Sequence, residues 1–275
     1  MSAPTTLREA VAALAREPRP LPVAGCTDLM VADATRRAGV ATVLDLLAIP
    51  ELRGIREDGG ALVIGAATSF SAIAASPLVG RIFPALAAAA AQIGGWQIQN
   101  RATLGGNVAN ASPAGDSLPV LLALGATIEV AGPAGERAIP YDEFHVGYRR
   151  TALEPQELIA RVRLPLPAAG SRQAFHKVGT RQAQAISKVA VAMLGRADGG
   201  AVRDLRLGAA SVAATPIRLL AAEQAAVGSP VAEAAERAAR AAAESVQPID
   251  DVRSTADYRR FALAAVVQRL VLGLA

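Results

Sequence analysis

The segment that most constrains the fold of this chain is RATLGGNVANASPAGD, residues 101–116. It contains three glycines, two asparagines, two small hydroxyl residues and one proline, and it ends on an aspartate. Adjacent glycines permit positive φ angles and let a ligand approach the main chain, while amide and hydroxyl side chains supply donors and acceptors. We therefore expect this segment to wrap around a bound molecule. The alternative is an ordinary β-turn with asparagine in a strained conformation.

A second glycine turn, VAGCTDL, lies at residues 23–29. An apolar run precedes it and helical spacing follows it, so Gly25 turns the chain between a strand and a helix. The N–H groups at such a helix start suit a phosphate, with Thr27 adding a hydroxyl and Asp28 capping the helix. The turn is neither the G-x-G-x-x-G of a Rossmann fold nor a Walker loop. We expect the two segments to close on a diphosphate from two sides.

The 275 residues, about half of them apolar, predict more than one lobe. The proline and glycine cluster at residues 165–170 predicts a boundary between domains 1–168 and 169–275, and the first should divide into subdomains of about 1–56 and 57–168. Periodicity and turn residues predict helices at residues 6–16, 28–38, 70–75, 78–93, 117–124, 216–225, 231–245 and 255–274. Strands are predicted at residues 21–24, 42–46, 52–56, 61–64, 127–131, 136–140, 157–164, 172–178, 186–195 and 203–210.

Charge and cysteine content exclude several classes of protein. The 28 basic and 24 acidic residues are interleaved, so no nucleic-acid partner is expected. Cys26 is the only cysteine, which rules out an internal disulfide and an iron–sulfur cluster held by this chain alone. His145 and His176 stand far apart, without metal-binding spacing, so no metal site is expected. No leader peptide and no membrane span is predicted, which favours a cytoplasmic protein.

Four stretches resemble the FAD-binding subunit of the molybdenum hydroxylases, the relatives of xanthine dehydrogenase and carbon monoxide dehydrogenase. They are AGCTDLM, QNRATLGGNVANASPAGDSLPVLLALGA, FHKVGTRQAQAISKVAVAM and IDDVRSTADYRR. The resemblance covers nearly the whole chain and is nearest to bacterial xanthine dehydrogenase and carbon monoxide dehydrogenase flavoprotein subunits. It implies an α+β fold. A two-lobed FAD-binding domain of the PCMH (vanillyl-alcohol-oxidase-like) type would precede a C-terminal α/β domain of the carbon monoxide dehydrogenase flavoprotein type, which has a small antiparallel sheet and helices.

The resemblance also implies which residues hold a non-covalent FAD. Main-chain amides around the first turn would bind the pyrophosphate, with Leu29 beside the flavin: Val23, Ala24, Gly25, Cys26, Thr27 and Asp28. The second segment would contact the diphosphate and ribityl chain through Thr103, Gly105, Gly106 and Asn107, and the adenosine or ribityl hydroxyls through Asn110 and Asp116. Apolar contacts near the cofactor would come from Ile93 and Ala102, and Ile159 would pack on the isoalloxazine ring. Lys177 would contact the cofactor; the alternative is a solvated surface lysine.

Cys26 departs from the resemblance, because the first motif usually carries glycine at this position. A cysteine would be strained there if the position required a positive φ angle. We expect instead that position 26 needs only a small side chain, so that FAD binding is intact. A small packing residue is also expected in preference to a thiol that reacts with the flavin, because the pyrophosphate should lie beside it.

The function implied is electron transfer within a three-part oxidoreductase. An iron–sulfur small subunit would deliver electrons, a molybdopterin large subunit would oxidise the substrate, and FAD would pass electrons to NAD⁺ or another acceptor. No catalytic residue is then required of this chain. Two alternatives remain: an assembly subunit with a vestigial flavin site, and a free-standing flavin oxidoreductase that uses His145, His176 or Tyr148 as acid or base. Xanthine or another purine is the substrate suggested by the nearest resemblance.

Overall fold

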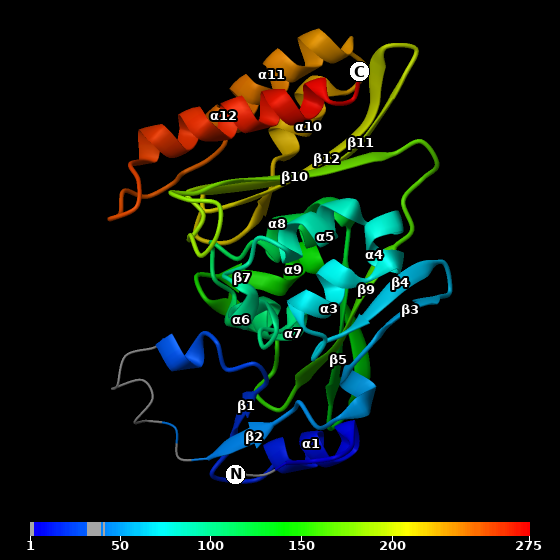
Figure 1. The fold of residues 1–275 in the computed structure, drawn as a ribbon, viewed down its shortest axis with the longest axis vertical. Helices are drawn as coiled ribbons and strands as arrows, with labels where there is room; N and C mark the ends of the chain where they lie inside the picture. The colour runs from blue at the N-terminus through cyan, green and yellow to red at the C-terminus, as the bar shows by residue number, and fades with distance from the viewer. Residues whose placement is uncertain (1–2, 32–39, 41) are drawn as a thin grey trace.

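The computed structural model describes residues 3–31, 40 and 42–275, and it arranges helices and strands in successive layers. In Figure 1 the helices α11 and α12 lie at the top, over a sheet that contains β10, β11 and β12. Below that sheet come shorter helices, then a second sheet, and at the bottom β1, β2 and α1. The fold is therefore α+β, as the sequence predicted.

The N-terminal layer is small and has its own core. Its elements are α1 (Leu7–Leu14), β1 (Leu21–Val23), the 3₁₀ turn η1 (Leu29–Val31), β2 (Val43–Asp45) and the 3₁₀ turn η2 (Pro50–Leu52). Thr6 and Glu9 form a capping box that starts α1. Strands β1 and β2 pair in parallel. The helix expected at residues 28–38 is described only as η1, and residues 32–38 of it lie outside the described part of the chain.

The central sheet has the strand order β3-β4-β9-β5-β6, with antiparallel neighbours. Its strands are β3 (Ile55–Asp58), β4 (Ala61–Gly65), β5 (Thr127–Gly132), β6 (Gly135–Pro140) and β9 (Leu158–Pro165). The accompanying helices are α3 (Phe70–Ala75), α4 (Pro77–Ile82), α5 (Pro84–Ala90), α6 (Trp96–Gln99), α7 (Leu104–Asn110), α8 (Ser117–Leu124) and α9 (Tyr141–Phe144). A short hairpin follows, made of β7 (His145–Gly147) and β8 (Arg150–Thr151).

The C-terminal layer is an antiparallel sheet covered by helices. It contains β10 (Arg172–Val178), β11 (Val189–Asp198), β12 (Ala201–Ala210), β13 (Ile217–Arg218), α10 (Leu220–Ala226), α11 (Val231–Glu244) and α12 (Ala256–Leu272). All eight residues of α8 are buried, because the helix packs against β11 and β12 of this sheet. Gly208 lets β12 approach closely, since a Cβ there would lie 2.0 Å from the Pro119 carbonyl oxygen.

Four sequence predictions need correction. The helix expected at residues 78–93 is divided at Phe83, because Pro84 has no N–H to continue α4 and instead opens α5. The segment expected as a glycine turn contains the helix α7. Strand β3 begins at Ile55, because the 3₁₀ turn η2 occupies residues 50–52. The helix expected at residues 216–225 begins only at Leu220, because strand β13 (Ile217–Arg218) adds two residues to the edge of the sheet.

Candidate functional site

The first bend, residues 24–28, presents a row of unused main-chain donors. The last bond of the parallel pair runs from Leu46 N–H to the Val23 carbonyl, and the chain then leaves the sheet. Among the residues that the structure describes, the N–H groups at positions 24 to 28 have no hydrogen-bond acceptor. The turn is closed instead by the Met30 N–H, which donates to the Cys26 carbonyl at 2.9 Å. Consecutive free N–H groups form a concave anion site.

Cys26 adopts a left-handed conformation, with φ 58°. This contradicts the expectation that position 26 needs only a small side chain, because the bend requires a positive φ angle there. A non-glycine residue in this region costs about 1–2 kcal/mol. Its Sγ lies 3.5 Å from the Ala24 carbonyl oxygen, so the side chain stays within the bend.

The second bend, residues 101–106 at the start of the second segment, touches the first bend at Gly25. A Cβ built on Gly25 would lie 1.9 Å from the Arg101 carbonyl oxygen and 2.9 Å from the Ala102 Cα. Real Cβ atoms do not approach backbone so closely, so only glycine allows this contact. The structure therefore brings the two segments together, as the sequence predicted.

The N–H groups of the second bend, unlike those of the first, are engaged within the protein. Leu104 donates to the Thr68 carbonyl at 3.1 Å, and Gly105 donates to the Ala66 carbonyl at 2.8 Å. Gly106 donates to Thr103 Oγ1 at 3.1 Å. A Cβ on Gly105 would lie 2.5 Å from the Ala66 Cβ, so this glycine serves the packing of α7 against the end of β4. The amides of Gly105 and Gly106 are thus not free for a ligand.

Side chains supply the polar groups that remain on this segment. Asn107 Oδ1 accepts a hydrogen bond from Ser117 Oγ at 2.7 Å, and no described residue accepts one from its Nδ2. Asn110 lies at the other end of α7, where its Oδ1 accepts from Arg149 at 3.0 Å. Ala111, in a left-handed conformation with φ 49°, ends the helix. Asn107 and Asn110 therefore lie about one and two turns along α7 from Thr103.

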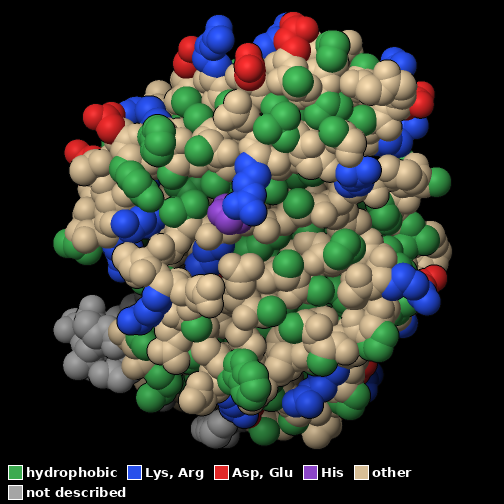
Figure 2. All heavy atoms as spheres, turned by 45° about the horizontal axis from the view of Figure 1, so that its top comes forward, with side chains coloured by type: hydrophobic (Ala, Val, Ile, Leu, Met, Phe, Trp, Pro, Cys, Tyr) green, Lys and Arg blue, Asp and Glu red, His purple; other side chains and the backbone are tan. Residues whose placement is uncertain are grey.

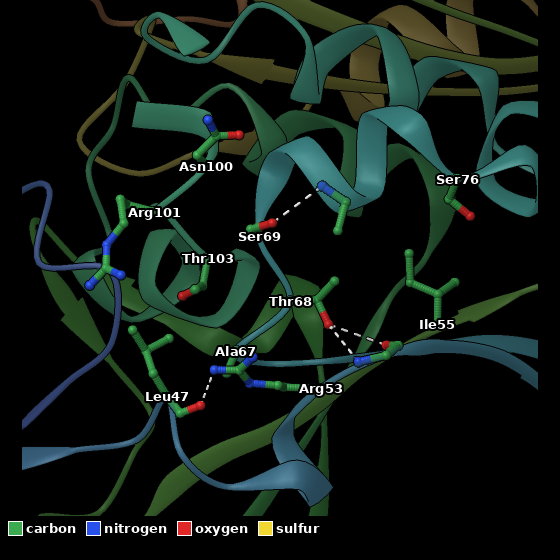
Figure 3. A pocket seen from close by; sticks show the side chains of 12 residues that line it. Leu47, Arg53, Ile55, Ala67, Thr68, Ser69, Ser76, Asn100, Arg101 and Thr103 are labelled. Carbon is green, nitrogen blue, oxygen red and sulfur yellow. Dashed lines mark hydrogen bonds between the residues drawn. The ribbon is translucent and has the colours of Figure 1, made fainter. Parts of the chain in front are cut away.

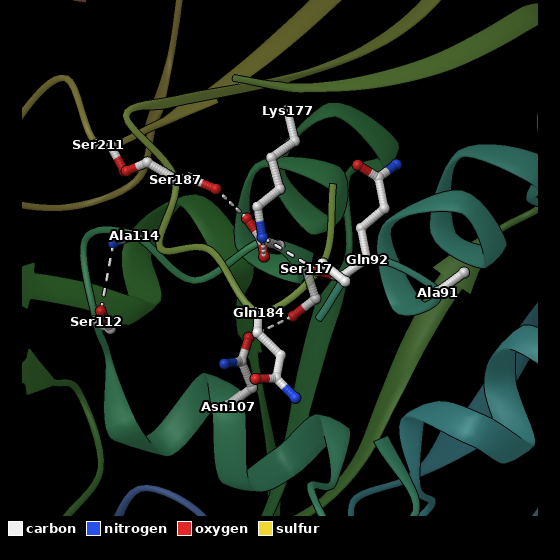
Figure 4. A network of polar contacts seen from close by, with 12 residues as sticks. Ala91, Gln92, Asn107, Ser112, Ala114, Ser117, Lys177, Gln184, Ser187 and Ser211 are labelled. Carbon is white, nitrogen blue, oxygen red and sulfur yellow. Dashed lines mark hydrogen bonds and ion pairs between the residues drawn. The ribbon is translucent and has the colours of Figure 1, made fainter. Parts of the chain in front are cut away.

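A buried polar network joins the second segment to the C-terminal layer (Figure 4). Lys177 on β10 donates from Nζ to Asp116 Oδ2 at 2.6 Å and to the Gln92 carbonyl at 3.1 Å. Ser187 donates to Asp116 Oδ1, and Ser211 donates to the Ser187 carbonyl at 2.9 Å. Burial raises the pKa of Asp116, while the charge of Lys177 and the hydrogen bonds from Lys177 and Ser187 act in the opposite direction.

The alternative of a solvated Lys177 is wrong, since its side chain is only 4% exposed. Both carboxylate oxygens of Asp116 are engaged by protein donors, from residues 61 and 71 positions away. The apolar residues expected near the cofactor, Ile93, Ala102 and Ile159, are buried members of the central hydrophobic core. Ile159 lies on β9 opposite Val130.

A cavity of about 490 Å³ adjoins the contact between the bends (Figure 3). Two of its lining residues, Arg101 and Thr103, belong to the second segment. The others come from three places: the β2–β3 connection, the start of α3 and its approach, and two neighbouring helix ends. They are Leu47, Arg53, Gly54, Ile55, Ala67, Thr68, Ser69, Ala72, Ser76 and Asn100. No sequence pattern indicated this cavity, because its residues are scattered along the chain and Thr68 and Ser69 predicted only a helix start.

Comparison with known proteins assigns the chain to a family. The FAD binding domain in molybdopterin dehydrogenase matches residues 1–167, and the carbon monoxide dehydrogenase flavoprotein C-terminal domain matches residues 174–274. This chain is an FAD-binding subunit of the molybdenum hydroxylase family. The family resemblance stated from the sequence is thereby confirmed, together with the order of the two folds.

Three relatives illustrate how far the similarity of this flavoprotein subunit extends. The carbon monoxide dehydrogenase medium chain of Hydrogenophaga pseudoflava is 34% identical over 270 residues, which cover 97% of this chain and 93% of the relative. The xanthine dehydrogenase FAD-binding subunit of Escherichia coli O157:H7 is 32% identical, covering 97% and 92%. The structure of quinoline 2-oxidoreductase from Pseudomonas putida 86 superimposes with a TM-score of 0.93 at 28% identity, covering 99% of this chain and 95% of that one.

The two histidines considered as an acid or base, His145 and His176, lie in partly buried positions of the flavoprotein subunit. His145 Nε2 lies 2.9 Å from the Tyr141 hydroxyl, and the imidazole packs edge-on against the rings of Tyr141 and Phe144. Burial lowers the pKa of His145 to about 4. Burial, followed by the charge of Arg269, lowers the pKa of His176. Both side chains therefore favour the neutral form at neutral pH.

The sequence also predicted neither a metal site nor a membrane-spanning helix. Within the described residues, no three His, Cys, Asp or Glu side chains are grouped so that they could hold a metal ion. Of the helices that the structure describes, none is both long and apolar enough to cross a bilayer. Figure 2 shows lysine and arginine scattered over the visible face rather than gathered into one patch.

Proposed function

We propose that the diphosphate of FAD lies on the first bend and faces the second. The observation that carries this proposal is the row of free N–H groups at positions 24 to 28, next to a contact that only Gly25 permits. Amide donors with partial positive charge bind a dianion without a lysine. The Thr103 hydroxyl and Asn107 Nδ2 belong to the segment that faces this row and can add side-chain donors. The residues present therefore fit the group that the family binds.

The cavity beside Arg101 and Thr103 is the place we assign to the adenosine end. Arg101, whose carbonyl meets Gly25, is one of its lining residues, and its walls mix apolar groups such as Leu47 and Ala72 with the hydroxyls of Ser69 and Ser76. Such a lining suits a purine and a ribose, which need apolar contact and a few hydrogen bonds. The flavin end would then extend the other way, towards Leu29, Ile159 and Lys177. Asn110 would lie beside the ribityl hydroxyls on the same side.

The activity proposed for the complex is oxidation of a substrate on another subunit, with this chain carrying electrons onward. FAD supplies the electron-carrying chemistry when it is bound, and the chain holds it and excludes water. The single cysteine cannot ligate an iron–sulfur cluster, so electrons would come from an iron–sulfur small subunit. A molybdopterin large subunit would oxidise the substrate, and NAD⁺ or another acceptor would receive the electrons. The names of the relatives, medium chain and FAD-binding subunit, support such an assembly.

The first experiment is to purify the full chain and count the flavin released on denaturation. The expected result is close to one FAD per chain, bound without a covalent link. Asn107→Ala should lower FAD retention because it removes the free amide, and Gly106→Val should do so by pushing against Thr103 Oγ1, 2.9 Å from a built Cβ. Unchanged retention in both variants would contradict the assigned site. Absence of flavin from both the isolated chain and its native complex would refute the proposal and favour an assembly role.

The proposed electron route is tested on the complex purified with its natural partners. Substrate oxidation there should reduce the flavin and then NAD⁺ or another added acceptor. The chain alone should oxidise no organic donor. Activity of the isolated chain would instead support a free-standing oxidoreductase.

A further inference from the structure

Arg149 contacts both segments from a third element, which no sequence motif had marked as part of the site. It sits between β7 and β8, at the tip of their hairpin. Its Nη1 donates to Asn110 Oδ1 at 3.0 Å and lies 3.7 Å from Asp28 Oδ2. Asp28 ends the row of free N–H groups on the first bend, while Asn110 ends α7 on the second segment. One side chain therefore contacts both segments.

The hairpin that carries Arg149 is fixed at its base. Ala152 N–H donates to the Phe144 carbonyl at 2.9 Å, and His145 is held by the Tyr141 hydroxyl. Arg149 itself has φ 51°, a left-handed conformation that a non-glycine residue rarely adopts. Strain of this kind persists where the surroundings over-determine the backbone, and it concentrates at functional sites. Here the strained residue is the one that reaches both bends.

The Gly25–Arg101 contact and the contacts of Arg149 lie at different places along the two segments. Gly25 meets the backbone of Arg101 and Ala102, and two segments joined in a single region can still turn about it. Arg149 adds a second connection, three residues beyond Gly25 on one segment and nine beyond Arg101 on the other. Two separated contacts fix the relative orientation of the free N–H row and α7.

The charge of Arg149 has a second consequence. The carboxylate of Asp28 lies at the end of the donor row that we assign to the diphosphate, where it would repel the bound dianion. The guanidinium offsets that charge and draws the carboxylate towards α7 instead of the donors. Both side chains are partly exposed, 34% for Arg149 and 44% for Asp28, so the pair itself adds little to folding stability. Its effect should be on FAD.

We propose that Arg149 is a positioning residue for FAD: it orients the first bend against α7 and neutralises Asp28 beside the diphosphate. This inference rests on the proposed function, since it assumes that the diphosphate lies on the first bend. Arg149 need not touch the cofactor for either effect.

The test compares the rates at which variants of the full chain release FAD. Release is measured as the change in flavin fluorescence after dilution. Arg149→Ala should release FAD about tenfold faster than the wild type, and Arg149→Lys should recover part of the loss because it keeps the charge. Adding Asp28→Asn to Arg149→Ala should return most of the wild-type rate, because the unpaired carboxylate is then gone. Arg196→Ala is the matched control: it removes an arginine whose partner, Asp204 at 2.7 Å, is also exposed and lies in the C-terminal layer.

The outcomes separate this inference from the proposed function. A wild-type chain that holds no FAD, alone or in its complex, would remove both. Wild-type retention with unchanged release from Arg149→Ala, at a melting temperature equal to that of the wild type, would overturn the role of Arg149 alone. Faster release that Asp28→Asn does not reverse would overturn the charge effect and leave the orienting contact. Equal acceleration by Arg196→Ala would show a nonspecific effect and overturn the inference.

Discussion

The two glycine bends resemble each other in sequence and differ in what their main chains do. The first bend leaves its N–H groups at positions 24 to 28 without acceptors among the described residues, and the second satisfies those of Leu104, Gly105 and Gly106 internally. The glycines differ in the same way. Gly25 keeps the first bend in contact with the second, whereas Gly105 packs α7 against β4. We therefore propose that the first bend binds the diphosphate and that the second segment supports it.

The second segment is bound to the C-terminal layer by hydrogen bonds and an ion pair. The second segment ends on Asp116, which is bound by Lys177 and Ser187 from the C-terminal layer. Within the described part of the chain, the first bend meets the backbone of Arg101 and Ala102 at Gly25 and is paired through Asp28 with Arg149. Changes in the first bend should therefore alter FAD binding more than folding, whereas loss of the Asp116 ion pair in the second segment should alter folding first.

The largest effect on FAD binding is expected from Gly25→Val, which breaks the contact on which the comparison depends. Even the Cβ would lie 1.9 Å from the Arg101 carbonyl oxygen, so the bends must separate. We expect at least about a hundredfold weaker FAD binding, which corresponds to about 2.7 kcal/mol, measured by titration of the flavin-free chain. The control is Gly80→Ala in α4, where a Cβ meets nothing within 4 Å. Normal FAD binding by Gly25→Val would show that the bends need not touch.

Asp116→Asn should have the largest effect on folding. It leaves Lys177 buried without a counter-charge, which costs about 3–5 kcal/mol of unfolding free energy, as measured by urea denaturation. Asp204→Asn removes an exposed partner of Arg196 and should change stability by no more than about 1 kcal/mol. Equal effects of the two variants would mean that the second segment is not fastened through this ion pair.

His145 makes the stability of the hairpin that carries Arg149 depend on pH. Burial lowers the pKa of His145 to about 4 from the ordinary value of 6.5, so between these values only the unfolded chain takes up the proton. The unfolding free energy should therefore fall as pH drops from about 6.5 towards 4, by about 1–2 kcal/mol after allowance for partial exposure. The His145→Leu variant should lose this part of the slope in denaturant titrations at several pH values. If the unfolding free energies of the wild type and the variant fall equally with pH, His145 is excluded as the source of the pH dependence.

Cys26→Gly should give the smallest effect and sharpen the picture of the first bend. Glycine adopts φ 58° without the cost that cysteine bears, so the variant should be more stable by about 1 kcal/mol. FAD should also bind at least as tightly, by thermal melting and flavin titration. Cys26→Ser keeps a side chain of similar size in the strained position and should not gain stability. If Cys26→Ser gained as much stability as Cys26→Gly, the effect would come from loss of the thiol and not from the backbone conformation.

Local patterns predicted much of the fold because their causes lie within a few residues. The helices α3 and α8 and the strand β10 have the predicted bounds, since caps, turns and apolar runs mark them directly. The helix α7 was missed for the opposite reason. Its two glycines disfavour a helix, and the carbonyls of Ala66 and Thr68 that satisfy its first N–H groups come from a distant part of the chain.

The candidate site divides along the same line. The bend sequences alone located both segments, and their family resemblance named the cofactor. The cavity beside Thr103 and the reach of Arg149 could not be foreseen, because their residues are scattered along the chain. The positive φ angle of Cys26 was also missed, since the sequence cannot show which conformation a turn requires of one residue.

The sequence by itself determined where the chain bends, which segments are apolar and which family the chain resembles. Only the tertiary structure decided which bend keeps free donors, that Asp116 and Lys177 bind each other, and that one arginine spans both bends. The physical reason is that a main-chain donor is free or engaged according to which distant carbonyl lies within hydrogen-bond range. That distance is set by packing between layers and not by the residues on either side of the donor.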